Sequence, residues 1–177
     1  MNSTPPPPIP QVADKLFLAL GQALYICQLF EGTMLEVLAH AYELLDGTGD
    51  GRQFQESIDT LSRKTLGQLL HEFRRRADIR QDIEILLVHG LEARNFVVHH
   101  FATHLGDDLT DARAIIAHQR SVYEKCATVM AANDSALALL ESIAKLNSAR
   151  SGTRLEAMDL KISALRVLAA KYAAPRH

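Results

Sequence analysis

The feature that most constrains the fold of this 177-residue chain is a long helical repeat near its beginning. Apolar residues recur there in alternating steps of four and three, which places their side chains on one face of an α-helix. A second apolar stripe widens that face, so we expect this helix to lie at the centre of the core. The first stripe comprises residues 16, 20, 23, 27, 30, 34, 37, 41 and 44.

Similar spacing predicts further helices, and no segment shows the strict alternation that is typical of a strand. We therefore expect an all-α fold, a four- to five-helix up-and-down bundle. Residues 1–11 form a Pro-rich lead, 12–147 the bundle, and 148–177 a C-terminal helix that docks on the bundle or on a partner. The expected helices cover about 12–45, 61–77, 80–105, 108–147 and 155–172. An earlier turn from Phe54 is an alternative start for the second, and Asn133 and Asp134 could divide the fourth.

The charge balance does not favour a general nucleic-acid binder. The chain has 19 Lys and Arg against 21 Asp and Glu, so any contact with RNA must be local. Its densest basic cluster is Arg74-Arg75-Arg76, a candidate RNA-binding element. A solvated helix face is the commoner explanation of such a cluster, and positive charge at the end of a helix also complements the helix dipole.

Composition also bears on compartment and cofactors. Cys27 and Cys126 both lie in apolar helical patterns. Buried free thiols are more typical of a protein in a reducing compartment than of a secreted protein. The N-terminus lacks the pattern of a secretory signal, and we find no apolar run of the roughly 20 residues that span a bilayer. The segment 46–57 partly matches a calcium loop, but Ser57 stands where the bidentate Glu belongs. We expect a cytoplasmic protein with no cofactor, no metal and no membrane association.

Reactive side chains concentrate in one stretch, Glu92–Phe101. It contains Arg94, Asn95, His99 and His100. Histidine transfers protons near neutral pH, and arginine binds a phosphate with a permanent charge. Together they could cleave a phosphodiester by attack of the RNA's own 2′-hydroxyl, without a metal.

The pattern Arg94-Asn95-x-x-x-His99 resembles the Arg-Asn-x-x-x-His signature of the HEPN superfamily (higher eukaryote and prokaryote nucleotide-binding). The resemblance implies a metal-independent endoribonuclease of toxin or defence type that acts on RNA. It also implies a homodimer with two motifs facing one cleft, and it allows for a regulatory protein partner. Many toxin members have a modifiable Tyr two places after the histidine. Here that residue is Phe101, so this form of control is not available at that position.

The motif raises a geometric problem. Residues five apart on an ideal α-helix point about 140° away from each other and are displaced by roughly 7.5 Å along its axis. A long Arg94 side chain curling round, a local π-bulge, or a second copy of the helix would each resolve it. Glu31 lies on the apolar side of the first helix, where an unpaired carboxylate is costly, so it is a candidate partner for Arg94. At the edge of that helix it would reach water instead.

Two alternatives remain open. The chain could be a non-catalytic helical module that binds a nucleotide or a protein, for example through the apolar stripe of 155–172. His100 and His104 have the spacing of two metal ligands, but no third ligand is evident on that face.

Overall fold

The computed structural model describes residues 11–46, 51–106, 108–151 and 162–167, and every element in these ranges is helical. The all-α prediction is confirmed for this part of the chain. The elements are α1 (Gln11–Asp46), α2 (Gly51–Leu61), α3 (Leu66–Arg76), α4 (Gln81–Asn95), the π-helical turn η1 (Phe96–His100), α5 (Phe101–Leu105), the 3₁₀ turn η2 (Asp108–Thr110) and α6 (Ala112–Ser151).

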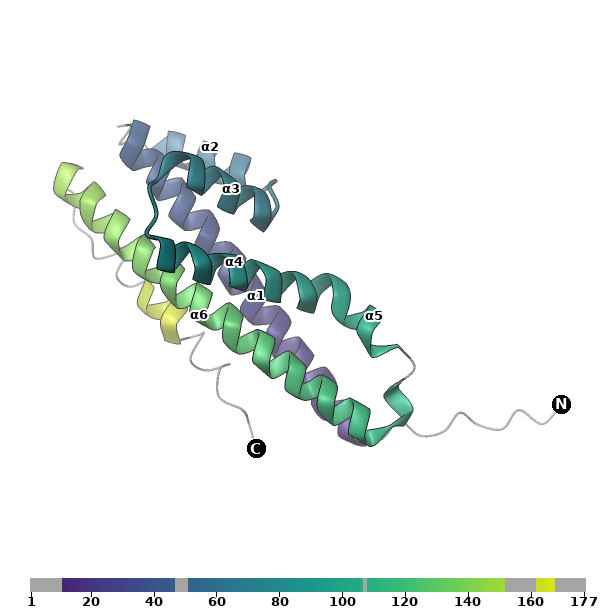
Figure 1. Ribbon diagram of the computed structural model, residues 1–177. Helices are drawn as coiled ribbons and strands as arrows, with labels where there is room; N and C mark the ends of the chain where they lie inside the picture. Colours follow the sequence, from purple (N-terminus) through teal and green to yellow (C-terminus); the bar gives the residue numbers. More distant parts are fainter. Residues whose placement is uncertain (1–10, 47–50, 107, 152–161, 168–177) are drawn as a thin grey trace.

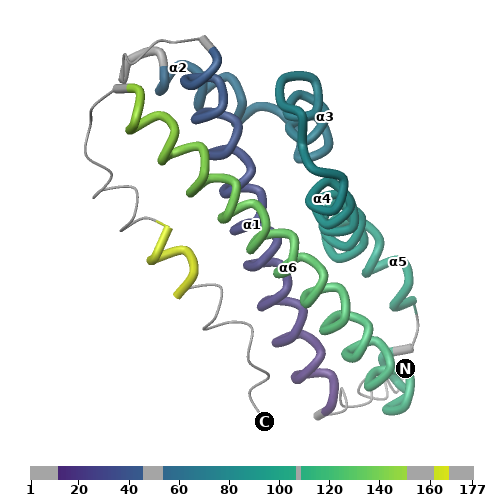
Figure 2. The backbone as a smooth tube through the Cα atoms, turned by 60° about the vertical axis from the view of Figure 1, so that its left-hand side comes forward, coloured from purple at the N-terminus to yellow at the C-terminus, as the bar shows by residue number. Residues whose placement is uncertain are grey.

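Three long helical runs, α1, α4 to α5, and α6, follow one another along the chain and alternate in direction (Figures 1 and 2). α1 and α6 lie side by side and run parallel, and α4 continues through η1 into α5 in the opposite direction against them. The shorter helices α2 and α3 cross over at the end where α1 stops. Two hydrogen bonds from α6 tie the same ends of α1 and α6 together, from Asn147 Nδ2 to the His40 carbonyl (3.1 Å) and from Arg150 Nη1 to the Leu44 carbonyl (2.5 Å).

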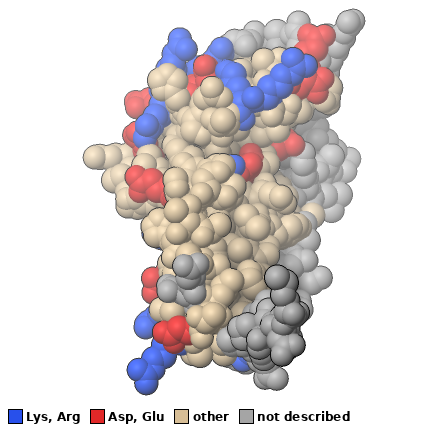
Figure 3. All heavy atoms as spheres, turned by 90° about the vertical axis from the view of Figure 1, so that its right-hand side faces the viewer, with Lys and Arg blue, Asp and Glu red and all other residues tan. Residues whose placement is uncertain are grey.

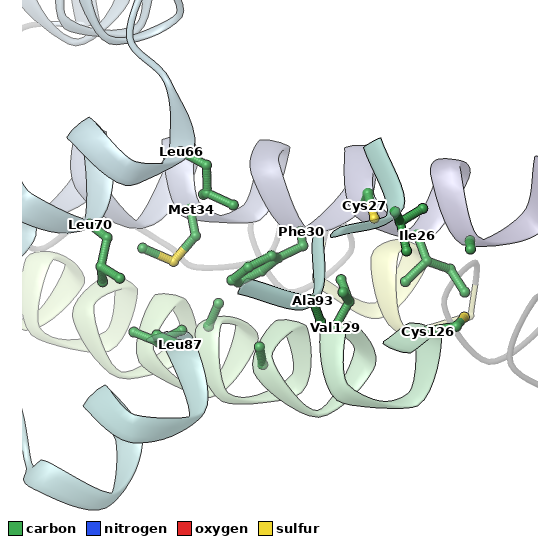
Figure 4. Close-up of a cluster of buried hydrophobic side chains, with 14 of the residues drawn as sticks. Ile26, Cys27, Phe30, Met34, Leu66, Leu70, Leu87, Ala93, Cys126 and Val129 are labelled. Carbon is green, nitrogen blue, oxygen red and sulfur yellow. The ribbon is translucent and has the colours of Figure 1, made fainter. Parts of the chain in front are cut away.

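The core follows the apolar stripes of the long helices. On α1 the buried positions include four that are seven residues apart, and α6 has a matching set with the same spacing, as in helices that pack along a continuous seam. Side chains of α1, α3, α4 and α6 converge in this core (Figure 4). The two sets are Leu16, Ala23, Phe30 and Val37 on α1, and Ile115, Val122, Val129 and Ala136 on α6.

Two expected helices differ from the structure. The helix predicted over about 61–77 begins later, at Leu66, and a separate helix, α2, occupies 51–61. The Thr65 amide donates to Gln68 Oε1 (2.8 Å) and the Gln68 amide donates to Thr65 Oγ1 (3.3 Å), a capping box that fixes the start of α3. Conversely, Asn133 does not interrupt α6. It is buried within an unbroken helix, since packing on both sides outweighs its turn preference.

Other boundaries are close to expectation. Gly106 ends α5 with a positive φ of 48°, a conformation that favours glycine, and Asp111 Oδ1 accepts from the Arg113 amide (2.9 Å) at the start of α6. The Pro-rich lead and most of 155–172 lie outside the described residues. Within 162–167, Ile162 is buried and Arg166 pairs with Glu141 of α6 (2.9 Å).

By length and composition alone, α1 could cross a membrane, contrary to the expectation that no segment has this property. The central helix of a packed core passes the same test, and α1 packs against α6 along its buried face.

Gly90 sets the distance between α4 and the α1–α6 pair. A Cβ atom there would lie 2.2 Å from the Ala132 Cβ of α6 and 3.1 Å from Phe30 Cε1 of α1. In contrast, no atom lies within 4 Å of a Cβ placed on Gly32. α4 can therefore approach its neighbours this closely only because residue 90 has no side chain.

We predict that Gly90→Ala lowers the free energy of unfolding by about 1–3 kcal/mol, because the added methyl group overpacks the helix contact. Gly32→Ala should raise it by about 0.4–1 kcal/mol, since alanine restricts the unfolded chain and meets no obstacle in the folded one. Urea unfolding of both variants measures the difference. Equal stability of Gly90→Ala and the wild type would contradict this account of the packing.

Candidate functional site

The helix changes from α-helical to π-helical geometry at the candidate motif. η1 is a π-helical turn, and the Phe101 amide donates to the Phe96 carbonyl five residues earlier rather than four. This wider turn brings residues five apart onto the same side of the helix. It reduces the 140° separation that an ideal α-helix would impose on Arg94 and His99, so the π-bulge, one of the three geometric solutions, is present in this structure.

The reason for the π turn lies in the buried face. Ala93, Val97, Phe101 and Leu105 are all buried and are spaced four residues apart. In an α-helix each such step drifts by 40°, so three steps would carry Leu105 about 120° away from Ala93. One additional residue in the turn offsets part of this drift and keeps all four side chains in the core. Three consecutive steps of four were the sequence signal for this turn.

Arg94 is the centre of the site. Its Nε donates to Glu31 Oε1 of α1 (2.5 Å), and its Nη1 donates to Asn95 Oδ1 (3.0 Å) and to His99 Nε2 (2.9 Å). The side chain of Arg94 is 16% exposed and that of Glu31 is 35% exposed. The structure thus brings together Arg94, Asn95, His99 and Glu31, including the ion pair expected between Arg94 and Glu31.

The contact with Arg94 determines the tautomer of His99. A guanidinium has only donors, so His99 Nε2 must accept with its lone pair and the ring proton must be on Nδ1. A proton on Nε2 would face an N–H group of Arg94. In this arrangement His99 therefore presents an unprotonated nitrogen beside a fixed positive charge.

The other motif residues support the turn. Phe101 is buried and meets Phe96 and His118 edge-on, with ring centroids 6.4 and 6.1 Å apart. His100 is exposed, and its carbonyl accepts from His104 Nδ1 (2.8 Å). The described residues contain no cluster of three or more His, Cys, Asp or Glu side chains that could hold a metal, so His100 and His104 lack a further ligand there.

Arg94 and His99 border an open pocket of about 550 Å³. Its walls come from α1 (Glu31), from the motif (Arg94, Asn95, His99 and His100), and from the start of α3. The positive end of the α3 dipole adds to the charges of Arg94 and Lys64. The complete lining is Glu31, Lys64, Thr65, Leu66, Gly67, Leu91, Arg94, Asn95, His99 and His100.

The pocket is also lined by three residues that were not predicted to be site residues: Lys64, Thr65 and Gly67. The spacing Thr65-x-x-Gln68 was a local signal for the start of α3, because it matches a capping box. That this helix start lies opposite His99 depends on how α3 packs, which no local pattern reveals.

The arginine cluster does not line this pocket. Arg74 pairs with Glu84 of α4 (2.7 Å), Arg75 lies 3.8 Å from Glu72, and the Arg76 guanidinium lies 3.8 Å from the centre of the Tyr42 ring. Arg75 and Arg76 border a neighbouring pocket instead.

The two thiols are not nucleophiles of this site. Burial raises the pKa of Cys27 to about 12, although the positive charge of Arg94 acts in the opposite direction. Burial also raises the pKa of Cys126. Both therefore remain protonated thiols within the core at neutral pH.

Comparisons with protein-family models, with curated proteins and with solved structures found no match for this chain.

We predict that the neutral His99 ring carries its proton on Nδ1. Long-range ¹H–¹⁵N correlation spectra of the histidine rings distinguish the two tautomers. Arg94→Gln should relax this preference, because an amide can either donate to Nε2 or accept from it. A wild-type spectrum with the proton on His99 Nε2 would show that the hydrogen bond to Arg94 does not form in solution.

Proposed function

We propose that this protein is a metal-independent endoribonuclease of the HEPN type, in which Arg94 and His99 act on the scissile phosphodiester. The observation that carries the proposal is the hydrogen bond between these two side chains at the edge of an open pocket. The resemblance of the motif to the HEPN signature supplies the reaction class, the cleavage of RNA without a metal. A toxin or defence role, controlled by a regulatory protein, would follow from the same resemblance.

The chemistry requires a base, a positive charge and an acid. As the base, His99 Nε2 takes the proton of the 2′-hydroxyl as its oxygen attacks phosphorus, and this requires Arg94 Nη1 to release Nε2 and turn to the phosphate. Arg94 stabilises the negative charge of the phosphorane, and its Nη2 group, which has no hydrogen-bond partner among the described residues, can donate to a phosphate oxygen. The bond from phosphorus to the 5′-oxygen then breaks, a proton is delivered to that oxygen, and a 2′,3′-cyclic phosphate remains.

A single copy presents only one Arg94/His99 pair, and a homodimer would supply a second histidine as the acid. In the proposed dimer two such pairs face one cleft. Exposed apolar side chains beside the site are consistent with such an interface. They include Val98 in η1 and Leu24, which lies two turns before Glu31 on α1.

A second candidate is a non-catalytic module that binds a nucleotide or a protein. The ion pair between Arg94 and Glu31 favours it, because a guanidinium engaged by a carboxylate and only 16% exposed can serve the fold alone. The two candidates differ in what His99 does. In the module His99→Ala leaves function unchanged, and in the enzyme it abolishes cleavage.

The test of catalysis is the cleavage of a labelled, mixed-sequence RNA in EDTA. We expect the wild type to produce cyclic-phosphate ends and His99→Ala and Arg94→Ala to be slower by at least about 100-fold, as is typical for loss of an acid–base or charge-stabilising group. His89→Ala and Arg113→Ala are matched controls, because both residues are exposed and neither lines the pocket.

Circular dichroism establishes that each variant is folded. Intact RNA at micromolar wild-type protein would contradict catalysis on free RNA. Equal cleavage by wild type and His99→Ala would show that the motif is not the source of the activity.

We expect sedimentation to show about twice the 19.6 kDa chain mass. Leu24→Glu should shift the protein towards the monomer and lower cleavage in parallel, since a charge cannot be buried unpaired in an apolar interface. Lys15→Glu, a charge change at an exposed α1 residue, is the control. A monomeric wild type with full activity would contradict the shared cleft.

A further inference from the structure

Two more hollows continue from the Arg94/His99 pocket along α3. One, of about 230 Å³, shares Glu31, Lys64 and Leu66 with that pocket. The next, of about 640 Å³, shares Leu61 and Lys64 with the one before it. Because Lys64 borders all three, the hollows adjoin one another in a row, which we call the α3 groove.

The chemical character of the α3 groove changes along its length. At one end it presents Arg94 and His99, and at the other Arg75 and Arg76. Between them the lining is mainly apolar, with Leu35, Leu61, Leu66 and Leu69. The order is thus cationic, apolar and cationic, with Lys64 at the junctions.

This order matches a single nucleic-acid strand. Its phosphates carry the negative charge, and an unpaired base offers an apolar face that can leave the stack and enter a pocket. A base in a duplex is held by its partner and cannot do so without unpairing. Tyr42 also borders the outer hollow, where the Arg76 guanidinium lies over one face of its ring.

We propose that the α3 groove holds a single strand of RNA, with the scissile phosphate at Arg94 and His99 and the flanking phosphates at Lys64, Arg75 and Arg76. This inference deepens the proposed function and rests on it. α3 spans about 15 Å at 1.5 Å per residue. At about 3.4 Å per stacked nucleotide, the groove accommodates roughly four nucleotides on one side of the cleavage point.

Carboxylates moderate the charge of the groove. Its four cations (Lys64, Arg75, Arg76 and Arg94) face three carboxylates (Glu31, Glu56 and Glu72). Figure 3 shows Lys and Arg side chains gathered towards the end of the molecule that carries α2 and α3, with carboxylates among them. Binding should therefore be modest and salt-dependent rather than driven by a large positive field.

Glu72 is the carboxylate that competes most directly with RNA. Its Oε1 lies 3.4 Å from Lys64 Nζ and 3.8 Å from Arg75 Nη1, and its Oε2 accepts from the Tyr42 hydroxyl (3.3 Å). A phosphate that binds Lys64 or Arg75 must displace these contacts. Loss of the Glu72 charge should therefore strengthen binding, while loss of the Lys64 charge should weaken it.

The probe is a fluorescent eight-nucleotide RNA with 2′-O-methyl riboses, which has no 2′-hydroxyl nucleophile and so reports binding alone. With anisotropy as the readout, Lys64→Gln should weaken binding about 5-fold, and Glu72→Gln should tighten it by a similar factor. Arg120→Gln should bind like the wild type, because Arg120 is 84% exposed on α6 and is not part of the groove. A blunt duplex of the same length should bind at least 10-fold more weakly.

Two further measurements examine the phosphate contacts and the base pocket. The four phosphate contacts predict a slope of about −3 for the logarithm of affinity against that of salt, and Lys64→Gln should reduce its magnitude by about 0.7. Gly32→Leu should weaken binding more than Gly32→Ala does, because Gly32 borders the apolar hollow and only the longer side chain fills it.

The outcomes separate this inference from the function on which it rests. If the 2′-O-methyl RNA binds as expected but unmodified RNA is not cut, the groove proposal is supported and the proposed ribonuclease activity is contradicted. If RNA is cut but Lys64→Gln and Glu72→Gln bind like the wild type, or the duplex binds as well as the single strand, the groove proposal is overturned. Absence of binding at micromolar protein overturns it as well.

Discussion

The parallel packing of α1 against α6 is the constraint on which the rest of the structure depends. Buried residues at seven-residue intervals on both helices keep one face of each in contact over their length. α4 then lies on this pair through Gly90, which allows the backbone of α4 to approach Ala132 and Phe30. With α4 held in that position, its final turn and η1 face Glu31 of α1.

The π-helical turn shows how core packing creates a site. Burial of Ala93, Val97, Phe101 and Leu105 along one face favours an additional residue in the turn, and the exposed residues of the turn are displaced as a result. His99 then faces back towards Arg94. π-bulges often occur at functional sites for this reason, since they re-aim one side chain without breaking the helix. The ion pair between Arg94 and Glu31 fixes the guanidinium in the same place.

Some of the site could be predicted from sequence, because part of it is local. Arg94, Asn95 and His99 lie within six residues, and the position of Glu31 on the apolar side of α1 pointed to a cationic partner. Lys64 and Thr65 could not be predicted, because their place opposite His99 depends on how α3 packs after the break at Thr65. Likewise, Arg74 is paired with a carboxylate of the next helix, which the run of arginines does not show.

The sequence by itself determined that the described chain is helical, which faces of its long helices are buried, and where glycine ends α5. These properties depend on side-chain periodicity and on backbone preferences within a few residues. Only the tertiary structure decided that Asn133 is accommodated within α6 and which geometry the motif adopts, a π turn. In both cases burial between helices outweighs a local preference, because burying an apolar side chain stabilises the fold more than a single residue's propensity opposes it.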